Sequence, residues 1–204
     1  MKRYSFRQHQ IRRTCTKTFD DYHSYSRYLH EDFSHRCCYC NVHEKTLGLL
    51  SFQIDHFIPE ARFKGIRDEL KTQYNNLMLA CPKCNNAKSD QYEGNILSTS
   101  IENQYFYNPD QVDYNTIFYR NEIGGISSDD PKGKEMIRRL KLYRKLHNLA
   151  WVLEQIDDLL VILQRQEELE CGEKREKIQI QRLRLLDKRC RMQAQFIAAY
   201  RSNR

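Results

Sequence analysis

Apolar residues recur at helical spacing through the last third of the chain. Asp130-Pro131 is a typical helix start, because Asp caps a first turn and Pro fits its first position. Apolar residues then follow at steps of three and four from Met136 to Leu163, which predicts one buried stripe. Gly172 interrupts the pattern, and a second apolar series follows it. We predict an antiparallel helical hairpin here, and one long kinked helix is the alternative.

The earlier part of the chain predicts short elements of both kinds. Aromatic residues and leucine near helical spacing predict a helix over residues 18–35. Two apolar runs, Leu49–Ile54 and Leu77–Ala80, have the length and composition of strands. Asn85 is a favoured cap residue and is expected to start a short helix. Residues 104–126 are aromatic and β-branched with a Pro turn and a Gly-Gly pair, which predicts an extended or hairpin region.

Together these elements predict an α+β fold of four segments. Residues 1–35 are a basic N-terminal arm and a helix, 36–95 a cysteine-rich core, 96–129 an extended connector and 130–204 a helical region. No apolar run reaches the roughly 18–20 residues that span a bilayer, so we expect no membrane insertion. The basic first residues lack the apolar segment of a secretory signal peptide, and we expect a cytoplasmic protein. An organelle transit peptide is the alternative for this basic start.

The net charge is +7, and it is unevenly distributed. Residues 131–204 carry 18 Lys or Arg against 10 Asp or Glu, and residues 1–17 carry 6 basic residues and no acidic one. The middle of the chain is therefore acidic. Basic flanks favour a polyanionic partner such as a nucleic acid, and solvated helix faces are the alternative.

Four of the eight cysteines form two Cys-x-x-Cys pairs, Cys37 with Cys40 and Cys81 with Cys84. In a reducing compartment such pairs indicate metal binding. Two turns that each present two thiolates are typical of a closed, structural Zn²⁺ site. Cys38 lies between the better-spaced residues of the first pair and is left out of the site. Four ordinary thiols are the alternative.

Polar residues of the kinds that catalyse reactions or bind metals lie between the two cysteine pairs and directly after the second pair. Asp55 and His56 end the first predicted strand, Asn76 precedes the second, and Asn85 directly follows the second cysteine pair. Adjacent strand residues point to opposite faces. Asp55 and His56 are therefore expected either to perform different tasks or to lie where the strand bends.

This order of residues resembles the HNH nucleases of the ββα-metal fold. The resemblance rests on Asp-His, then Asn before a short apolar strand, then Cys-x-x-Cys-Asn-x-x-Lys, and it covers roughly residues 36–90. Many members carry a third His where this chain has Asn85. The HNH domain of the RNA-guided CRISPR nuclease also has Asn at that position, so the difference is a known variant.

The resemblance implies a role for each of these residues. His56 is implied to be the general base that activates a water for attack on a DNA phosphate. Asp55 and Asn85 are implied to bind one divalent ion, Mg²⁺ or Mn²⁺, and Asn76 to brace the loop that carries His56. The cysteine-rich core is then a small zinc-stapled nuclease core between flanking helices.

The chemistry of these side chains agrees with the implied roles. A neutral imidazole accepts a proton near pH 7, and oxygen ligands suit a hard ion that keeps its waters. Lys88 follows Asn85 by one helical turn and is expected to hold a flanking phosphate, and Arg62 is a second candidate for that contact.

The segments outside the core resemble stand-alone bacterial HNH proteins in their order. Some of these, such as the nuclease of the Septu anti-phage system, act with a separate ATPase. The resemblance implies a role in anti-phage defence and a partner ATPase, or self-association through the C-terminal helices. Arg138, Lys141 and Lys145 share one face of the predicted helix and are candidates for contacts with the DNA backbone, although a solvated helix face is the favoured interpretation.

Two other classes of function stay open on the sequence. The first is a zinc-ribbon module that binds nucleic acid without cutting it. The second is a helical adaptor with a purely structural zinc site. Neither needs Asp55, His56, Asn76 and Asn85 at these intervals, and for this reason a metal-dependent DNA endonuclease is the preferred reading.

Overall fold

The computed structural model describes residues 2–48, 52–98 and 100–202. The fold is α+β, as the sequence predicts, and it divides into two compact units, Met1–Tyr143 and Arg144–Arg204. The division falls after Tyr143, so the first helix of the predicted C-terminal region belongs to the first unit.

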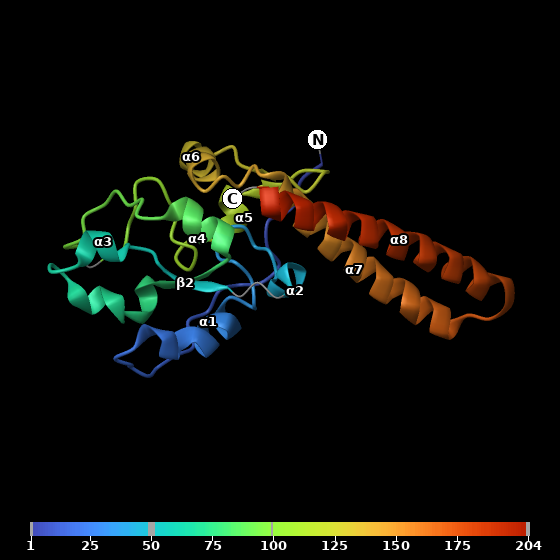
Figure 1. The fold of residues 1–204 in the computed structure, drawn as a ribbon, viewed down its shortest axis with the longest axis horizontal. Coiled ribbons are helices and arrows are strands. Elements are labelled where there is room, and N and C mark those ends of the chain that lie inside the picture. Colours follow the sequence, from blue (N-terminus) through green and yellow to red (C-terminus); the bar gives the residue numbers. More distant parts are fainter. Residues whose placement is uncertain (1, 49–51, 99, 203–204) are drawn as a thin grey trace. The chain divides into compact units, whose positions relative to one another are not determined.

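The first unit contains two small sheets and several short helices (Figure 1). The strands are β1 Tyr4–Ser5, β2 Gln53–His56, β3 Leu77–Ala80, β4 Tyr119–Arg120 and β5 Ile126–Ser127. The α-helices are α1 Ser26–Asp32, α2 Glu44–Leu47, α3 Glu60–Phe63, α4 Pro82–Lys88, α5 Tyr114–Ile117 and α6 Pro131–Arg139, with 3-10 turns η1 Tyr22–Tyr25, η2 Asp68–Lys71 and η3 Tyr74–Asn76.

The second and smaller sheet, with α4 packed beside it, forms a ββα unit. Strands β2 and β3 are antiparallel, with Asp55 opposite Met78 and His56 opposite Leu77. The prediction for β3 is confirmed, and β2 is displaced from its predicted bounds: it begins at Gln53 and ends at His56. Of the predicted strand Leu49–Ile54, residues 49–51 lie outside the described part of the chain.

Helix α4 begins three residues earlier than predicted. Cys81 has extended backbone dihedrals and precedes Pro82, which occupies the first helical position. Proline is suited to this position because its fixed φ is helical and its missing N–H is not needed there. The prediction that Asn85 caps this helix is therefore wrong: Asn85 lies inside α4, one turn before Lys88.

The predicted helix over residues 18–35 is shorter than expected. The Asp21 side chain accepts a hydrogen bond from the His23 backbone N–H and so caps the η1 turn that leads into α1. Helix α1 then ends at Asp32. Ser34 and His35 follow with φ of 51° and 56°, a left-handed conformation that cannot continue a right-handed helix.

The basic N-terminal arm packs into the fold, and its strand β1 is paired within a sheet. Strand β1 pairs with β4, which pairs with β5, so the arm and the predicted hairpin region share one sheet. Arg7 is buried and donates a hydrogen bond from Nη2 to the Cys38 carbonyl oxygen at 3.1 Å. Arg13 forms an ion pair with Asp110 at 2.7 Å. The expectation that the arm as a whole is available to a nucleic acid is therefore wrong for these two arginines.

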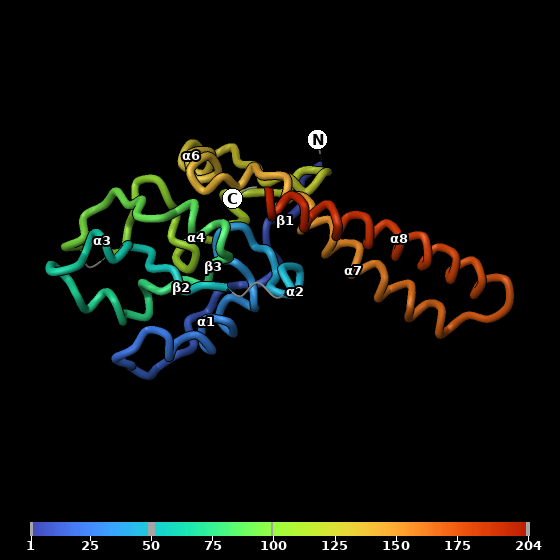
Figure 2. The backbone as a smooth tube through the Cα atoms, in the orientation of Figure 1, coloured from blue at the N-terminus to red at the C-terminus, as the bar shows by residue number. Residues whose placement is uncertain are grey.

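The second unit is a pair of long helices, α7 Lys145–Leu169 and α8 Gly172–Ser202, packed side by side and antiparallel (Figure 2). The predicted hairpin is thus confirmed, and the kinked-helix alternative is excluded. Gln179 donates a hydrogen bond to Glu167, and Arg189 forms an ion pair with Asp157. Both pairs are centred on residue 173, as expected for two antiparallel helices in a constant register.

The predicted apolar stripe from Met136 to Leu163 does not lie on one helix. Helix α6 ends at Arg139, and Lys141 adopts a left-handed conformation with φ of 53° before α7 begins. Arg138, Lys141 and Lys145 consequently do not share one helical face, so the arrangement on which their predicted joint contact with DNA rested is absent. Periodicity alone cannot detect this break, because leucines at compatible spacing continue across it.

Among the described residues, no helix combines the length and the apolar character that a membrane crossing requires.

The cap of α6 gives a first testable prediction. Asp130 accepts hydrogen bonds from the Gly133 backbone N–H at 2.6 Å and from the Tyr107 hydroxyl at 3.0 Å. We expect Asp130→Ala to lower the free energy of unfolding by roughly 1–2 kcal/mol, the usual contribution of a helix cap. Urea-induced unfolding measures this change.

Asp129→Ala is the matched control for the cap. Asp129 forms an exposed ion pair with Arg3 and caps no helix, so its loss should cost less than about 1 kcal/mol. Equal destabilisation by the two substitutions would show that the cap contributes nothing specific.

Candidate metal centre and catalytic site

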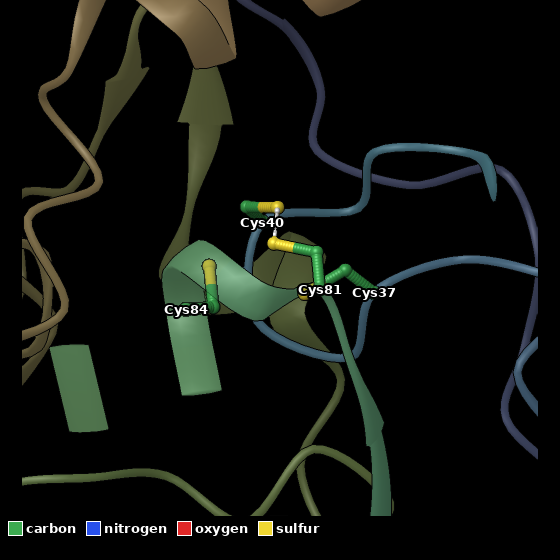
Figure 3. Close-up of side chains that lie close together, drawn as sticks. All are labelled: Cys37, Cys40, Cys81 and Cys84. Carbon is green, nitrogen blue, oxygen red and sulfur yellow. Dashed lines mark hydrogen bonds between the residues drawn. The ribbon is translucent and has the colours of Figure 1, made fainter. Parts of the chain in front are cut away.

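The four cysteines of the two Cys-x-x-Cys pairs converge on one point (Figure 3). All four side chains are buried, and their sulfur atoms lie within 4.8 Å of one another. They come from three places in the fold: Cys37 and Cys40 from the turn after α1, Cys81 from the end of β3, and Cys84 from the first turn of α4.

This arrangement fits a tetrahedral zinc ion. With Zn–S bonds of about 2.3 Å, the sulfurs of a tetrahedral site lie about 3.8 Å apart. The Cys40 and Cys81 sulfurs are 3.8 Å apart. Burial raises the pKa of the Cys40 thiol, so a thiolate at this depth requires a compensating cation. The donor set therefore suits Zn²⁺. Four thiolates would fill the tetrahedral coordination shell of the ion and leave no open position for a substrate.

Buried backbone contacts fix the first cysteine turn to its surroundings. The Cys38 N–H donates to the Leu79 carbonyl oxygen at 2.8 Å, which ties the turn to β3. Arg120, itself buried, donates from Nη2 to the Cys40 carbonyl oxygen at 2.7 Å. Cys38 is buried but is not among the four converging cysteines.

Asp55 lies on the face of β2 that meets α4, and both of its carboxylate oxygens accept hydrogen bonds. Lys88 donates to Oδ1 at 2.9 Å, and the Tyr39 hydroxyl donates to Oδ2 at 2.5 Å. Burial, followed by the charge of Asp55, raises the pKa of Tyr39 well above its usual range. Tyr39 thus stays protonated and keeps its role as a donor.

The position of Lys88 contradicts the predicted contact with a flanking phosphate. Its side chain is 0% exposed and forms an ion pair with Asp55. Its Nζ also donates to the His56 carbonyl oxygen at 2.7 Å. Because its whole side chain is buried, Lys88 cannot reach a phosphate in solvent. It instead holds the Asp55 carboxylate and the backbone of His56 in place.

Asn85 lies one turn before Lys88 on the same side of α4. Its Nδ2 donates to Oε1 of Gln53 at 2.9 Å. Gln53 precedes Asp55 by two residues and therefore shares its face of β2. Two successive turns of α4 thus meet alternate residues of β2, which brings the Asn85 amide and the Asp55 carboxylate to the same side of the ββα unit.

His56 is on the opposite face of β2. Its Nε2 lies 2.9 Å from the Lys71 carbonyl oxygen, and its ring makes edge contacts with the rings of Tyr22 and Phe63. A carbonyl oxygen only accepts, so Nε2 carries a proton in this contact, and in the neutral ring Nδ1 has a lone pair. The imidazole is thus held in one orientation with one nitrogen basic.

Asn76 is fully buried and uses its whole amide group to hold the loop after His56. Its Oδ1 accepts from the Ile58 N–H at 2.8 Å, and its Nδ2 donates to the carbonyl oxygens of Ile58 at 3.2 Å and Leu70 at 3.1 Å. Its backbone carbonyl accepts from the Phe57 N–H at 2.8 Å. These bonds join the chain on both sides of the His56 ring.

Arg62 lies on α3 with an exposed side chain, and its Nε donates to the Asp90 carbonyl oxygen at 3.3 Å.

Three neighbours of the candidate site residues were not predicted from the sequence: Tyr39, Gln53 and the carbonyl of Lys71. Tyr39 lies between Cys37 and Cys40, and this position was the one feature of the sequence that could have indicated its role. A backbone carbonyl gives no sequence signal at all.

The cysteine cluster gives a second prediction. Cys40→Ser should lose the bound zinc and lower the melting temperature, because the short elements of the ββα unit depend on the metal for stability. Elemental analysis and thermal unfolding of the purified chain measure both effects.

Cys38→Ser is the control for the cluster, since Cys38 is buried in the same turn but is not one of the four converging cysteines. It should retain one zinc per chain. If Cys38→Ser lost zinc while Cys40→Ser kept it, the ligand set would be wrong.

The Asp55–Lys88 pair gives a third prediction. Lys88→Met removes one partner of a buried pair and leaves the Asp55 carboxylate without its counter-charge. We expect the free energy of unfolding to fall by roughly 3–5 kcal/mol. Lys64→Met, at an exposed lysine of the same unit, should leave it nearly unchanged. An unaltered urea midpoint for Lys88→Met would contradict the structural role.

Comparison with known protein families agrees with this geometry. Residues 37–91 match the model of the HNH endonuclease family. No curated protein and no solved structure matches the chain. The match includes both cysteine pairs and the ββα unit between them. Residues 37–91 of this chain thus match an HNH endonuclease domain and carry a four-cysteine cluster.

Proposed function

We propose that the chain is a metal-dependent endonuclease that hydrolyses phosphodiester bonds of DNA. The observation that carries this proposal is the state of His56. Its Nε2 is engaged by the Lys71 carbonyl oxygen at 2.9 Å, and the residue before it in β2 is Asp55. A surface histidine without a catalytic role does not require a ring held in one orientation. Nor does it require a fully buried Asn76 that holds the loop after it.

His56 acts as the general base in this proposal. Nδ1 accepts a proton from a water molecule while the water oxygen bonds to the phosphorus atom. The bond from phosphorus to the leaving oxygen of the sugar breaks, and that oxygen is protonated by solvent. The imidazolium then returns its proton to water, and the neutral ring is restored. A base fixed in this way contributes roughly 10²–10⁴-fold to rate.

Asp55 and Asn85 are the residues that would hold the catalytic ion. A hard divalent ion such as Mg²⁺ or Mn²⁺ supplies charge neutralisation to the phosphate and the leaving oxygen when it is bound. A carboxylate has about four lone-pair sites, so Asp55 can accept from Lys88 and Tyr39 and still offer a ligand position. Lys88 and Tyr39 fix that carboxylate in orientation.

Asn76 and Arg62 complete the proposed site in supporting roles. Asn76 positions His56 by bonding the segments on both sides of its ring. Arg62 is exposed on α3 and can approach a phosphate flanking the scissile bond. A guanidinium suits this contact because it donates two parallel hydrogen bonds to phosphate oxygens.

One such site cuts one strand, so a double-strand break requires two copies or two encounters. The second unit offers a means of association, because it exposes several large apolar side chains. These are Leu159, Val161, Ile162, Leu169, Ile180, Leu183 and Leu186. Self-association through these residues, or docking of a partner ATPase in anti-phage defence, stays a prediction from the sequence resemblance.

The fourth prediction tests His56. His56→Ala should lower Mg²⁺-dependent cleavage of plasmid DNA by roughly 10²–10⁴-fold while zinc content and melting temperature stay unchanged. His23→Ala removes an exposed histidine that pairs with Asp21 and should cleave like the unaltered chain. Cleavage by His56→Ala at the unaltered rate would exclude His56 as the base.

The same plasmid assay tests the proposed ion ligands by comparing substitutions at two adjacent residues, Asn85 and Asn86. Asn85→Ala should raise the Mg²⁺ concentration for half-maximal cleavage by at least about tenfold. Asn86→Ala, at the exposed neighbouring position, should not. A non-catalytic nucleic-acid-binding module is the alternative, and it would retain DNA binding with no cleavage in Mg²⁺ or Mn²⁺.

A further inference from the structure

A second group of metal-ligating side chains lies outside the proposed active site. His30 is in the last turn of α1, His35 is in the turn that follows α1, and Glu44 is the first residue of α2. One ligand atom from each of the three lies within 4.8 Å of those from the others. We propose that these residues form a second metal site, which binds one divalent transition ion of the zinc class.

The distances within the group are close to those of a coordination shell. His30 Nδ1 lies 2.9 Å from Oε2 of Glu44, and His35 Nδ1 lies 2.7 Å from Oε1. In a tetrahedral zinc site, bonds of about 2.0–2.2 Å place neighbouring ligand atoms about 3.3 Å apart. Small side-chain rotations therefore convert the present hydrogen bonds into metal bonds.

The backbone holds the three residues together independently of any ion. The His35 N–H donates to the His30 carbonyl oxygen at 2.8 Å, and the Glu44 N–H donates to the His35 carbonyl oxygen at 2.9 Å. The left-handed conformation of His35 turns the chain back after α1. A preorganised backbone lowers the entropic cost of binding an ion.

The donor set selects the kind of ion. Two imidazoles and one carboxylate suit Zn²⁺, Co²⁺ or Ni²⁺, whereas Mg²⁺ prefers oxygen ligands alone. A tautomer shift to Nε2 leaves each Nδ1 lone pair available to the ion. The side chains of His30, His35 and Glu44 are 26%, 48% and 34% exposed, so an ion reaches them from solvent. At least one coordination position remains for water.

The location suggests what the ion does. Residues 36–43 connect His35 to Glu44, and this connection contains Cys37 and Cys40. An ion bound by His30, His35 and Glu44 would tie the end of α1 to the start of α2 and close the chain around the first cysteine turn. The second site would thus reinforce the first without sharing a ligand with it.

Co²⁺ titration of the zinc-loaded full chain tests this site. Excess Mg²⁺ in the buffer fills sites made of oxygen ligands. We expect one Co²⁺ per chain in addition to the retained zinc, with visible d–d absorption and without the thiolate charge-transfer band of a cysteine site. Glu44→Gln and His35→Gln should each weaken Co²⁺ binding by at least about tenfold.

His23→Gln is the matched control. His23 also contacts a carboxylate through Nδ1, at 2.8 Å from Asp21, but among the described residues it belongs to no group of three metal-ligating side chains. Its replacement should leave Co²⁺ binding unchanged. Far-UV circular dichroism and zinc content show that each variant is folded.

Three outcomes would overturn the proposal. The first is no Co²⁺ uptake beyond the zinc equivalent, which would make the group a hydrogen-bonded pair of histidines on one carboxylate. The second is equal uptake by Glu44→Gln, His35→Gln and the unaltered chain. The third is uptake only with loss of zinc and a thiolate band, which would place the Co²⁺ in the cysteine cluster.

Discussion

The convergence of four buried thiols is the constraint on which the rest of the HNH domain depends. Strands β2 and β3 have four residues each, too few for a stable hairpin without further support. Cys81 directly follows β3 and occupies the N-cap position of α4, so one cysteine joins the strand to the helix. The turn with Cys37 and Cys40 covers them and is bound to β3 through the Cys38 N–H. The four converging cysteines thereby join these short elements at one point.

Buried polar bonds then determine where the chemical groups lie. The amide of Asn76 and the ion pair of Lys88 with Asp55 are costly to desolvate and are stable only with all partners in place. This requirement fixes the loop after His56 and the carboxylate at the end of β2. The two faces of one strand thus acquire different tasks, with Asp55 toward α4 and His56 toward η2.

Several basic residues bind within the protein and are not available to a nucleic acid. Arg7 and Arg120 donate to carbonyl oxygens of the first cysteine turn, and Lys88 neutralises Asp55. The net charge of +7 therefore overstates the charge that a DNA phosphate meets. Local counts of Lys and Arg do not separate solvated cations from buried ones, because the difference depends on which carbonyls and carboxylates fold against them.

The α+β class, strand β3, the four converging cysteines and the helical hairpin could all be predicted from the amino-acid sequence, because spacing along the chain encodes each of them. The sequence also singled out Asp55, His56, Asn76 and Asn85 through the order of the motif. Only the tertiary structure decided that Lys88 is buried, that α4 starts at Pro82, and that the stripe after Met136 divides between two helices. These features depend on contacts between residues distant in sequence, such as Lys88 with Asp55, or on a single left-handed residue. Neither leaves a periodic signal in the chain.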